Sequence, residues 1–235
     1  MVTFAWCTVA VTPVDRRDAS ALQAACARDL YRLYLWQAAD GYRDSLALCL
    51  IDAALALRMN YSAVTDVIDA YCRRRRQSGD DAFTDSVDEL RQATNQLGDV
   101  DPAAGSAIRR AAKVFSESGV QNVSQLRRDG ASLHPMRQAW RAALGPGSTA
   151  AWSYAMRLAH VPDVPADRLI VGYVAEAIGV SPRRLAPTIA TRLIAAAADG
   201  LGGNRMHLEH AIWRFQAGRS YREPDRVTRS MGMAG

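Results

Sequence analysis

The sequence 144-LGPGSTA-150 reads as a Gly-Pro-Gly hairpin that begins a helix. A hairpin of this kind leaves several backbone N–H groups pointing outward at a helix N-terminus, where they suit a phosphate oxygen. A second stretch, 164-VPAD-167, follows and places the carboxylate of Asp167 at the start of the next helix. Together the two stretches predict a captured DNA phosphate with a single acid close to it.

Apolar residues recur at helical spacing along most of the chain, and no alternating strand pattern competes with them. The sequence therefore predicts an all-α fold of about ten helices in short-linked antiparallel array. One of them opens with the capping box Ser86-Val87-Asp88-Glu89 and extends to about Leu97. The last is expected to end near Ala217, and the polar residues 220–235 are predicted to be a disordered tail.

The hairpin, the aspartate and the helix-rich order around them resemble the helix-hairpin-helix DNA glycosylases of the endonuclease III superfamily over residues 44–216. This resemblance implies a two-lobed helical fold with a cleft between the lobes. Residues 45–160 would form a central helical barrel lobe that includes the hairpin. Residues 1–44 and 161–219 would form the second lobe. The hairpin and the aspartate would then lie at the mouth of the cleft.

Two departures from the family pattern define a subtype. The slot in which lyase-competent members carry a lysine is Thr149 here, and Lys113, the only lysine of the chain, lies on an earlier helix. A Schiff base needs an amine, so no lysine-dependent lyase activity is expected. No cysteine follows Cys72, so the iron–sulfur cluster of some members is also absent. The resemblance therefore points to the monofunctional type.

The function that the resemblance implies is base excision repair. The protein would be a DNA N-glycosylase, a hydrolase that cleaves the N-glycosidic bond of a damaged or modified base flipped out of duplex DNA. Asp167 would be its catalytic residue, stabilising positive charge on the sugar and orienting or deprotonating the attacking water. The alternative is that Asp167 is an ordinary N-cap, worth about 1 kcal/mol to its helix.

DNA-phosphate binding is predicted for the backbone of four hairpin residues: Gly145, Gly147, Ser148 and Thr149. The alternative is an ordinary helical corner that needs glycine for a positive φ. The hairpin carbonyls could also hold a monovalent cation, as the resemblance suggests. No other cofactor and no metal ligand set is predicted, because the four cysteines are widely scattered.

A pocket for the flipped base, or a wedge that fills its gap, is predicted before and after the first barrel helix. The loop in which many family members carry glutamine reads 58-RMNY-61 here. Each aromatic candidate could equally be a core residue, and a buried carboxylate needs a partner. Glu209 and His210 beside Trp213 are interpreted as a hydrogen-bonded core pair. The pocket or wedge candidates are Trp36, Tyr42, Asp52, Arg58, Asn60 and Tyr61.

Charge and hydropathy narrow the expected partners. The 235-residue chain carries 29 basic and 24 acidic residues, a net charge of +5 that mildly favours a polyanionic partner. The resemblance implies that this partner is double-stranded DNA. It has no apolar run of 18 residues and no convincing signal peptide, so we expect a cytoplasmic, nucleoid-associated monomer without a membrane partner. Two alternatives stay open: a catalytically inactive helix-hairpin-helix DNA-binding protein, or a purely structural helical protein.

Overall fold

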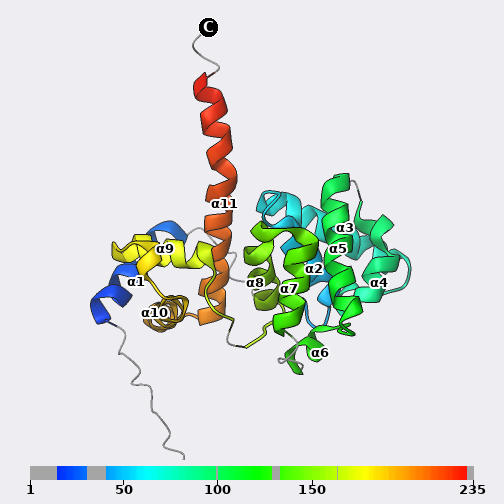
Figure 1. Ribbon diagram of the computed structural model, residues 1–235, viewed down its shortest axis with the longest axis horizontal. Helices are drawn as coiled ribbons and strands as arrows, with labels where there is room; N and C mark the ends of the chain where they lie inside the picture. The colour runs from blue at the N-terminus through cyan, green and yellow to red at the C-terminus, as the bar shows by residue number, and fades with distance from the viewer. Residues whose placement is uncertain (1–14, 31–40, 99, 129–132, 163, 232–235) are drawn as a thin grey trace, which may run out of the picture.

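Helices make up all the regular structure in the part of the chain that is described. The computed structural model describes residues 15–30, 41–98, 100–128, 133–162 and 164–231, and no strand occurs in these ranges (Figure 1). The all-α prediction is therefore confirmed. Within the described ranges, four short 3-10 turns join the helices: η2 (Ala82–Thr84), η3 (Thr94–Leu97), η5 (Pro146–Ser148) and η6 (Pro182–Arg184).

Eleven α-helices are found in the described ranges. In chain order they are α1 (Arg16–Leu30), α2 (Leu46–Leu55), α3 (Tyr61–Gln77), α4 (Val87–Gln92), α5 (Pro102–Glu117), α6 (Val123–Arg128), α7 (Leu133–Leu144), α8 (Thr149–Leu158), α9 (Arg168–Ile178), α10 (Pro187–Gly200) and α11 (Arg205–Met231).

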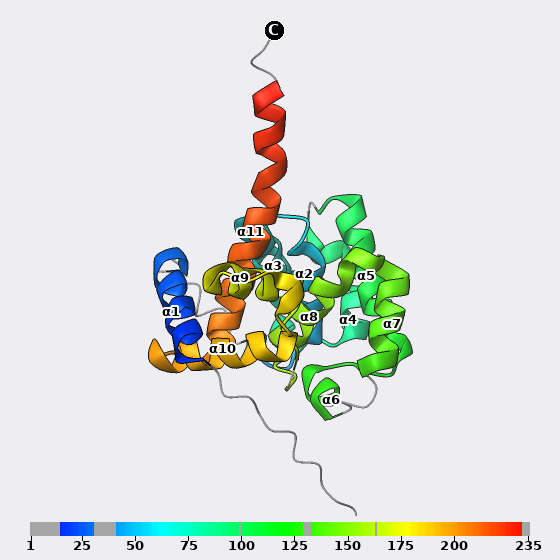
Figure 2. The same ribbon diagram turned by 60° about the vertical axis from the view of Figure 1, so that its left-hand side comes forward.

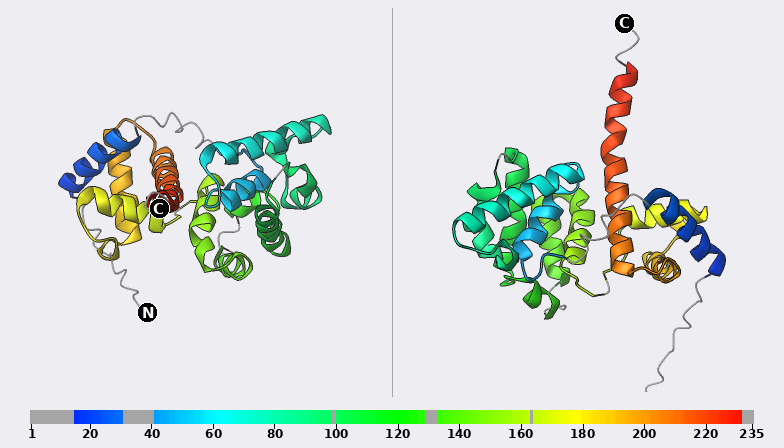
Figure 3. Two further views of the ribbon diagram at one scale, coloured as in Figure 1. Left: turned by 90° about the horizontal axis from the view of Figure 1, so that it is seen from above. Right: turned by 180° about the vertical axis from the view of Figure 1, so that it is seen from behind.

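The helices pack as two groups. We call α2–α8 the central group and α1, α9, α10 and α11 the flanking group, because the main helix contacts fall within these sets. Figure 3 shows the same division from above and from behind, with α11 and α8 on the facing sides of the two groups, and in Figure 2 α1 and α10 lie on the side away from α5 and α7. α11 contacts α8 directly. Helices from the two ends of the described chain therefore share one group.

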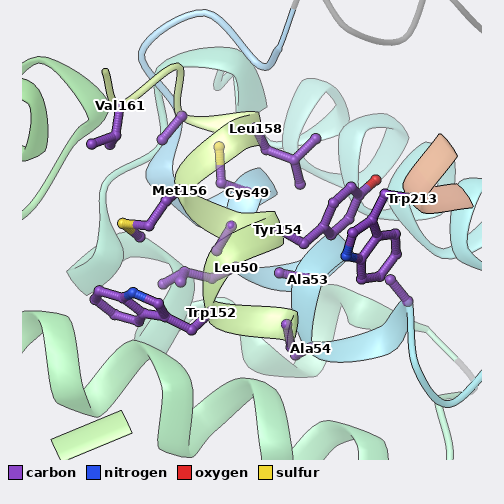
Figure 4. Close-up of a cluster of buried hydrophobic side chains, with 14 of the residues drawn as sticks. Cys49, Leu50, Ala53, Ala54, Trp152, Tyr154, Met156, Leu158, Val161 and Trp213 are labelled. Atoms are coloured by element: carbon purple, nitrogen blue, oxygen red, sulfur yellow. The ribbon is translucent and has the colours of Figure 1, made fainter. Parts of the chain in front are cut away.

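α2 and α8 form the inner layer of the central group. Every residue of α2 is buried, and in α8 the residues from Ala150 to Leu158 are buried as well. Figure 4 shows side chains of both helices interleaved, with Trp213 of α11 laid against them. The Trp213 ring stacks on Tyr154 of α8 at a centroid distance of 3.9 Å. α8 is therefore held firmly along its whole length.

Side-chain caps set several helix starts, one of which the sequence predicts. The capping box of Ser86 and Glu89 is present, but α4 ends at Gln92 and continues as the turn η3 rather than as one helix to Leu97. Asn60 caps α3 by accepting a hydrogen bond from the Ala63 N–H at 2.9 Å. Such caps satisfy backbone donors that a helix start leaves unpaired.

The last helix differs from the prediction. α11 continues to Met231, so residues 220–231 are helical, whereas the sequence predicted a helix end near Ala217 and a disordered tail. In Figure 1 the C-terminal turns of α11 project beyond the other helices. These turns follow a helix that is already nucleated and packed, so each added residue needs only its own intrahelical bond.

A buried ion pair stabilises the outer side of the central group. Asp85 accepts hydrogen bonds from Arg75 Nε and Nη2 and from the Tyr71 hydroxyl, each at 2.7 Å. The Asp85 side chain is 2% exposed, whereas Asp80, which also pairs with Arg75, is 44% exposed. The buried Arg75–Asp85 pair is therefore costly to break, whereas the more exposed Arg75–Asp80 pair is cheap to break.

We expect Asp85→Ala to lower the free energy of unfolding by about 3–5 kcal/mol, because it leaves the Arg75 charge buried without its main partner. Asp80→Ala is the matched control and should cost under about 1 kcal/mol. Urea unfolding of both variants measures the difference. Equal losses would show that the Arg75–Asp85 pair carries no special weight.

Candidate nucleic-acid interface

The predicted hairpin is present between α7 and α8. Gly145 has φ 90° and ψ 167°, a backbone conformation that essentially only glycine adopts. Its N–H donates to the Arg141 carbonyl at 2.9 Å and ends α7. Pro146 and Gly147 are exposed, and a Cβ placed on Gly147 would meet no atom within 4 Å. The tip of the hairpin is therefore open to a partner.

Internal hydrogen bonds fix the shape of the hairpin. The buried Trp140 of α7 donates its indole N–H to the Ser148 carbonyl at 3.0 Å. The hydroxyls of Ser148 and Thr149 turn back to the carbonyls of Gly145 and Pro146, at 2.6 and 3.3 Å. No side chain caps the N-terminus of α8. The first N–H groups of this ten-residue helix therefore have no side-chain acceptor, as an anion site requires.

The hairpin carbonyls do not suit the monovalent cation that the family resemblance suggests. The Gly145 carbonyl accepts both the Ser148 N–H at 3.1 Å and the Ser148 hydroxyl at 2.6 Å, which uses both of its lone pairs. Nor do the described residues include three or more His, Cys, Asp or Glu side chains grouped for a metal ion. We derive no role for a cation here.

A pocket of about 320 Å³ lies beside the hairpin and joins it to the loop after α2. Gly147 and Ser148 line it together with Arg58, and Trp140 and Ala54 are among its apolar walls. The Arg58 side chain is exposed, and none of the ion pairs between described residues involves it. The structure therefore brings a predicted wedge residue to the hairpin, where it supplies a positive charge.

Asp167 is the N-cap of α9 and is buried. Its Oδ1 accepts the Leu169 and Ile170 N–H groups at 2.8 and 3.3 Å. Its Oδ2 accepts Arg157 Nη1 at 2.8 Å and Trp213 Nε1 at 3.0 Å. A carboxylate offers about four lone-pair sites, and four donors occupy them here. The side chain is 3% exposed.

The partners of Asp167 place it away from the hairpin. Arg157 lies eight residues after Thr149 on α8, about 12 Å along the helix axis. The carboxylate is thus held at the C-terminal half of α8, whereas the hairpin is at its N-terminus. This geometry agrees with the alternative in which Asp167 is an N-cap, and the ion pair with Arg157 adds to that structural role. Catalysis by Asp167 stays a prediction, and it requires the carboxylate to leave these donors.

Three of the six pocket candidates meet around a residue that the sequence did not single out. Arg214 of α11 donates to both oxygens of Asp52, at 2.7 and 2.9 Å, and its guanidinium lies 4.1 Å from the Tyr61 ring centroid. Tyr42 and Tyr154 donate to the same carboxylate at 2.8 and 3.3 Å. Burial, and then Asp52, raises the pKa of the Tyr42 hydroxyl well above its ordinary value, so it stays a donor.

The other pocket candidates do not join this cluster. Asn60 is exposed and caps α3, and Arg58 is at the hairpin. Trp36 lies outside the described residues. The sequence signal for Arg214 is indirect: an acid in the otherwise apolar helix α2 must have a buried partner, but its spacing does not name that partner.

Glu209 and His210 are both buried but are not the hydrogen-bonded pair that the sequence predicted. Glu209 Oε2 accepts Arg157 Nε at 3.3 Å. The ring nitrogen Nε2 of His210 has no hydrogen-bond partner. Burial, with Arg214, His207 and Arg157 nearby, lowers the pKa of His210 from 6.5 to about 3. The side chain is therefore neutral in the folded protein at neutral pH.

We expect Asp167→Asn to lower the free energy of unfolding by about 3 kcal/mol, because asparagine keeps the cap but leaves the buried Arg157 short of a counter-charge. Urea unfolding measures this, with Asp199→Asn, an exposed acid on α10, as the control. Removing an acid held for catalysis often leaves stability unchanged or raises it. That outcome would reject the structural role.

The buried neutral His210 predicts acid sensitivity. The unfolded chain protonates this histidine near its ordinary pKa of 6.5 and the folded chain only near 3. The unfolded state thus binds more protons, so stability falls as pH drops below about 6.5. From pH 7 to pH 5 the contribution is about 2 kcal/mol.

Urea unfolding at the two pH values checks this expectation. His210→Gln should lose most of the difference, whereas the same change at His134, which is exposed on α7, should keep it. If the His210 variant keeps the full pH difference, another group is responsible.

No helix in the described ranges has the length and apolar character needed to span a membrane.

Comparison with other proteins identifies the family of this chain. No curated protein and no solved structure matches the chain. One family model, described as "Domain of unknown function (DUF8548)", matches residues 20–106 and 102–217. These two segments span most of the described helices, so the chain belongs to the DUF8548 family.

Proposed function

We propose that this protein binds the backbone of duplex DNA through the α7–α8 hairpin. The observation that carries the proposal is the exposed hairpin tip with Arg58 beside it, in front of a helix whose N-terminus no side chain caps. Backbone N–H groups and the helix dipole favour an anion there. A nearby guanidinium can donate to a phosphate through its planar fork.

The rigidity of the hairpin supports this proposal. Trp140 anchors the Ser148 carbonyl, and its ring packs edge-on against Phe115 and Trp152 at 6.2 and 5.6 Å. The N–H groups at the start of α8 are therefore held in place before any ligand arrives, which reduces the entropy cost of binding. Contacts of this kind go to the phosphates and carry no sequence information, so we propose binding with little sequence preference.

Binding alone is the function that the geometry favours over base hydrolysis. The resemblance to monofunctional glycosylases requires Asp167 to face a sugar, but its four acceptor sites are filled. We therefore propose that the protein is a catalytically inactive DNA-binding protein of the helix-hairpin-helix type. Release of bases is the rival outcome of the test below.

We expect Gly147→Ala to reduce DNA affinity at least about tenfold while leaving stability unchanged. The added Cβ meets no atom of this protein within 4 Å, so any loss of affinity must come from a partner approaching the backbone. Fluorescence anisotropy with a short duplex measures affinity, and thermal unfolding measures stability. Gly172→Ala on α9, also with no atom within 4 Å of the added Cβ, is the matched control.

Arg58→Ala extends the same experiment. Loss of one phosphate contact should weaken binding to all sequences alike and reduce the slope of log affinity against log salt by about one. Arg184→Ala, an exposed arginine of η6 in the flanking part of the chain, should keep the slope. Unchanged DNA affinity in both the Gly147→Ala and the Arg58→Ala variant would reject the proposal. Base release from DNA carrying alkylated, mismatched or hypermodified bases would instead support the glycosylase.

A further inference from the structure

A group of cations lies on the exposed side of α5. This helix packs against both α7 and α4 and lies between them in Figure 1. Arg109, Arg110 and Lys113 are all exposed, and Lys113 follows the two arginines by four and three residues, which places the three side chains on one side of the helix. We call these three residues the α5 surface. Neither the hairpin nor Arg58 belongs to it.

Two residues of the α5 surface line a pocket of about 660 Å³ between α4 and α5. Arg109 and Lys113 line it from α5, and Asp88, Arg91 and Gln92 line it from α4. Three of these five side chains are cations and one is an anion, so the walls carry a net positive charge. The side chains of Lys113 and Arg91 are 64% and 49% exposed. A ligand can therefore touch the charged groups directly.

The acids beside this pocket offset only part of its positive charge. Asp88 Oδ1 accepts the Ser116 hydroxyl at 2.8 Å and Arg91 Nη1 at 3.4 Å, so its charge is paired with Arg91. Glu117 lies 3.5 Å from Lys113, but both side chains are exposed, and lysine before glutamate is the weaker order for a pair four residues apart. Exposed pairs of this kind add little stability. A phosphate can therefore replace Glu117 beside Lys113 at little cost.

The two arginines of the α5 surface lie back along their helix. None of the ion pairs between described residues involves Arg109. Its Nη1 lies 3.6 Å from the position that a Cβ on Gly105 would take. Arg110 Nη1 donates to the Ser106 hydroxyl at 2.7 Å. Both guanidinium groups are therefore turned toward the first turns of α5.

The same turns of α5 reach the pocket beside the hairpin. Ala107 lines that pocket, two residues before Arg109 and six before Lys113. At 1.5 Å per residue, Arg109 and Lys113 follow Ala107 by about 3 and 9 Å along the helix axis. Phosphates of one DNA strand follow one another at about 3.4 Å along the duplex axis. A duplex that contacts the hairpin therefore carries further phosphates at spacings comparable with these axial distances.

We propose that the α5 surface is a second contact for the backbone of the duplex that the hairpin binds, with a phosphate entering the pocket between α4 and α5. This inference rests on the proposed function. The forks of Arg109 and Arg110 donate to phosphate oxygens, and the Lys113 ammonium supplies a point charge. Phosphate contacts orient a protein on a duplex. Two of them therefore set the direction in which the DNA crosses the central group, from the hairpin over α5 toward α4.

Lys113 makes a direct test possible, because it is the only lysine of the chain. The full chain is acetylated with sulfo-NHS-acetate, and peptide mass spectrometry follows the reaction of this one side chain. A short duplex, at a concentration at which fluorescence anisotropy shows saturation, should slow the acetylation of Lys113 at least about fivefold, because the bound backbone covers the amine. Sodium tripolyphosphate at the same phosphate concentration should protect it far less.

Two outcomes of this experiment would overturn the inference. The first is acetylation of Lys113 at the rate of the free protein while the duplex is bound, which would mean that the DNA lies elsewhere. The second is equal protection by tripolyphosphate, which would mean that the pocket holds small anions rather than a duplex.

Variants separate this inference from the hairpin proposal. Arg109→Ala combined with Lys113→Gln should lower DNA affinity at least about tenfold and reduce the slope of log affinity against log salt by about two. Lys113→Arg keeps the charge and should bind as the parent does. Arg183→Ala, an exposed arginine of η6, is the matched control. Thermal unfolding should be the same in all of them, because these side chains are exposed.

The combined variant and Gly147→Ala give distinguishable results. If the combined variant binds DNA as the parent does while Gly147→Ala binds more weakly, the α5 surface is rejected and the hairpin stands. If only the combined variant binds more weakly, the α5 surface is supported as a DNA contact and the hairpin is rejected. Losses in both variants support both contacts, and a parent protein without DNA affinity overturns both.

Discussion

A buried arginine of α8 holds the two helix groups together. Arg157 of α8 donates to Asp167 at the start of α9, to Glu209 of α11 and to the Pro165 carbonyl. These partners come from the segment after α8 and from the flanking group. One guanidinium therefore joins the flanking group to the central group. An arginine can do this because its planar fork presents several donors in fixed directions. Lysine could not replace it.

A second buried arginine repeats the arrangement farther along α11. Arg214 pairs with Asp52 of α2 and lies over the rings of Tyr61 and Tyr154, at 4.1 and 4.9 Å from their centroids. Buried ion pairs add little net stability, because desolvation offsets much of the attraction. They do penalise wrong packing, since any other register strands a charge away from water. The two pairs thus fix how α11 lies against α2 and α8.

This packing holds the hairpin and Asp167 at different ends of α8, whereas the glycosylase interpretation requires them to act together. α8 presents its N-terminus to solvent as the hairpin and uses its other end to bind Asp167. Arg157, which holds Asp167, lies about 12 Å along the helix axis from Thr149 at the hairpin. The exposed end suits a phosphate. The buried end suits stability.

The sequence alone determined the helical class, the capping box at Ser86 and the glycine hairpin, because spacing, caps and positive-φ glycines act over a few residues. It also indicated that Asp52 and Asp167 needed an explanation. It could not show which partner each acid takes, since Arg214 and Arg157 are 162 and 10 positions away. Only tertiary packing decides the partner of each acid, because the hydrogen bonds that a buried carboxylate accepts depend on which donors other helices bring to it.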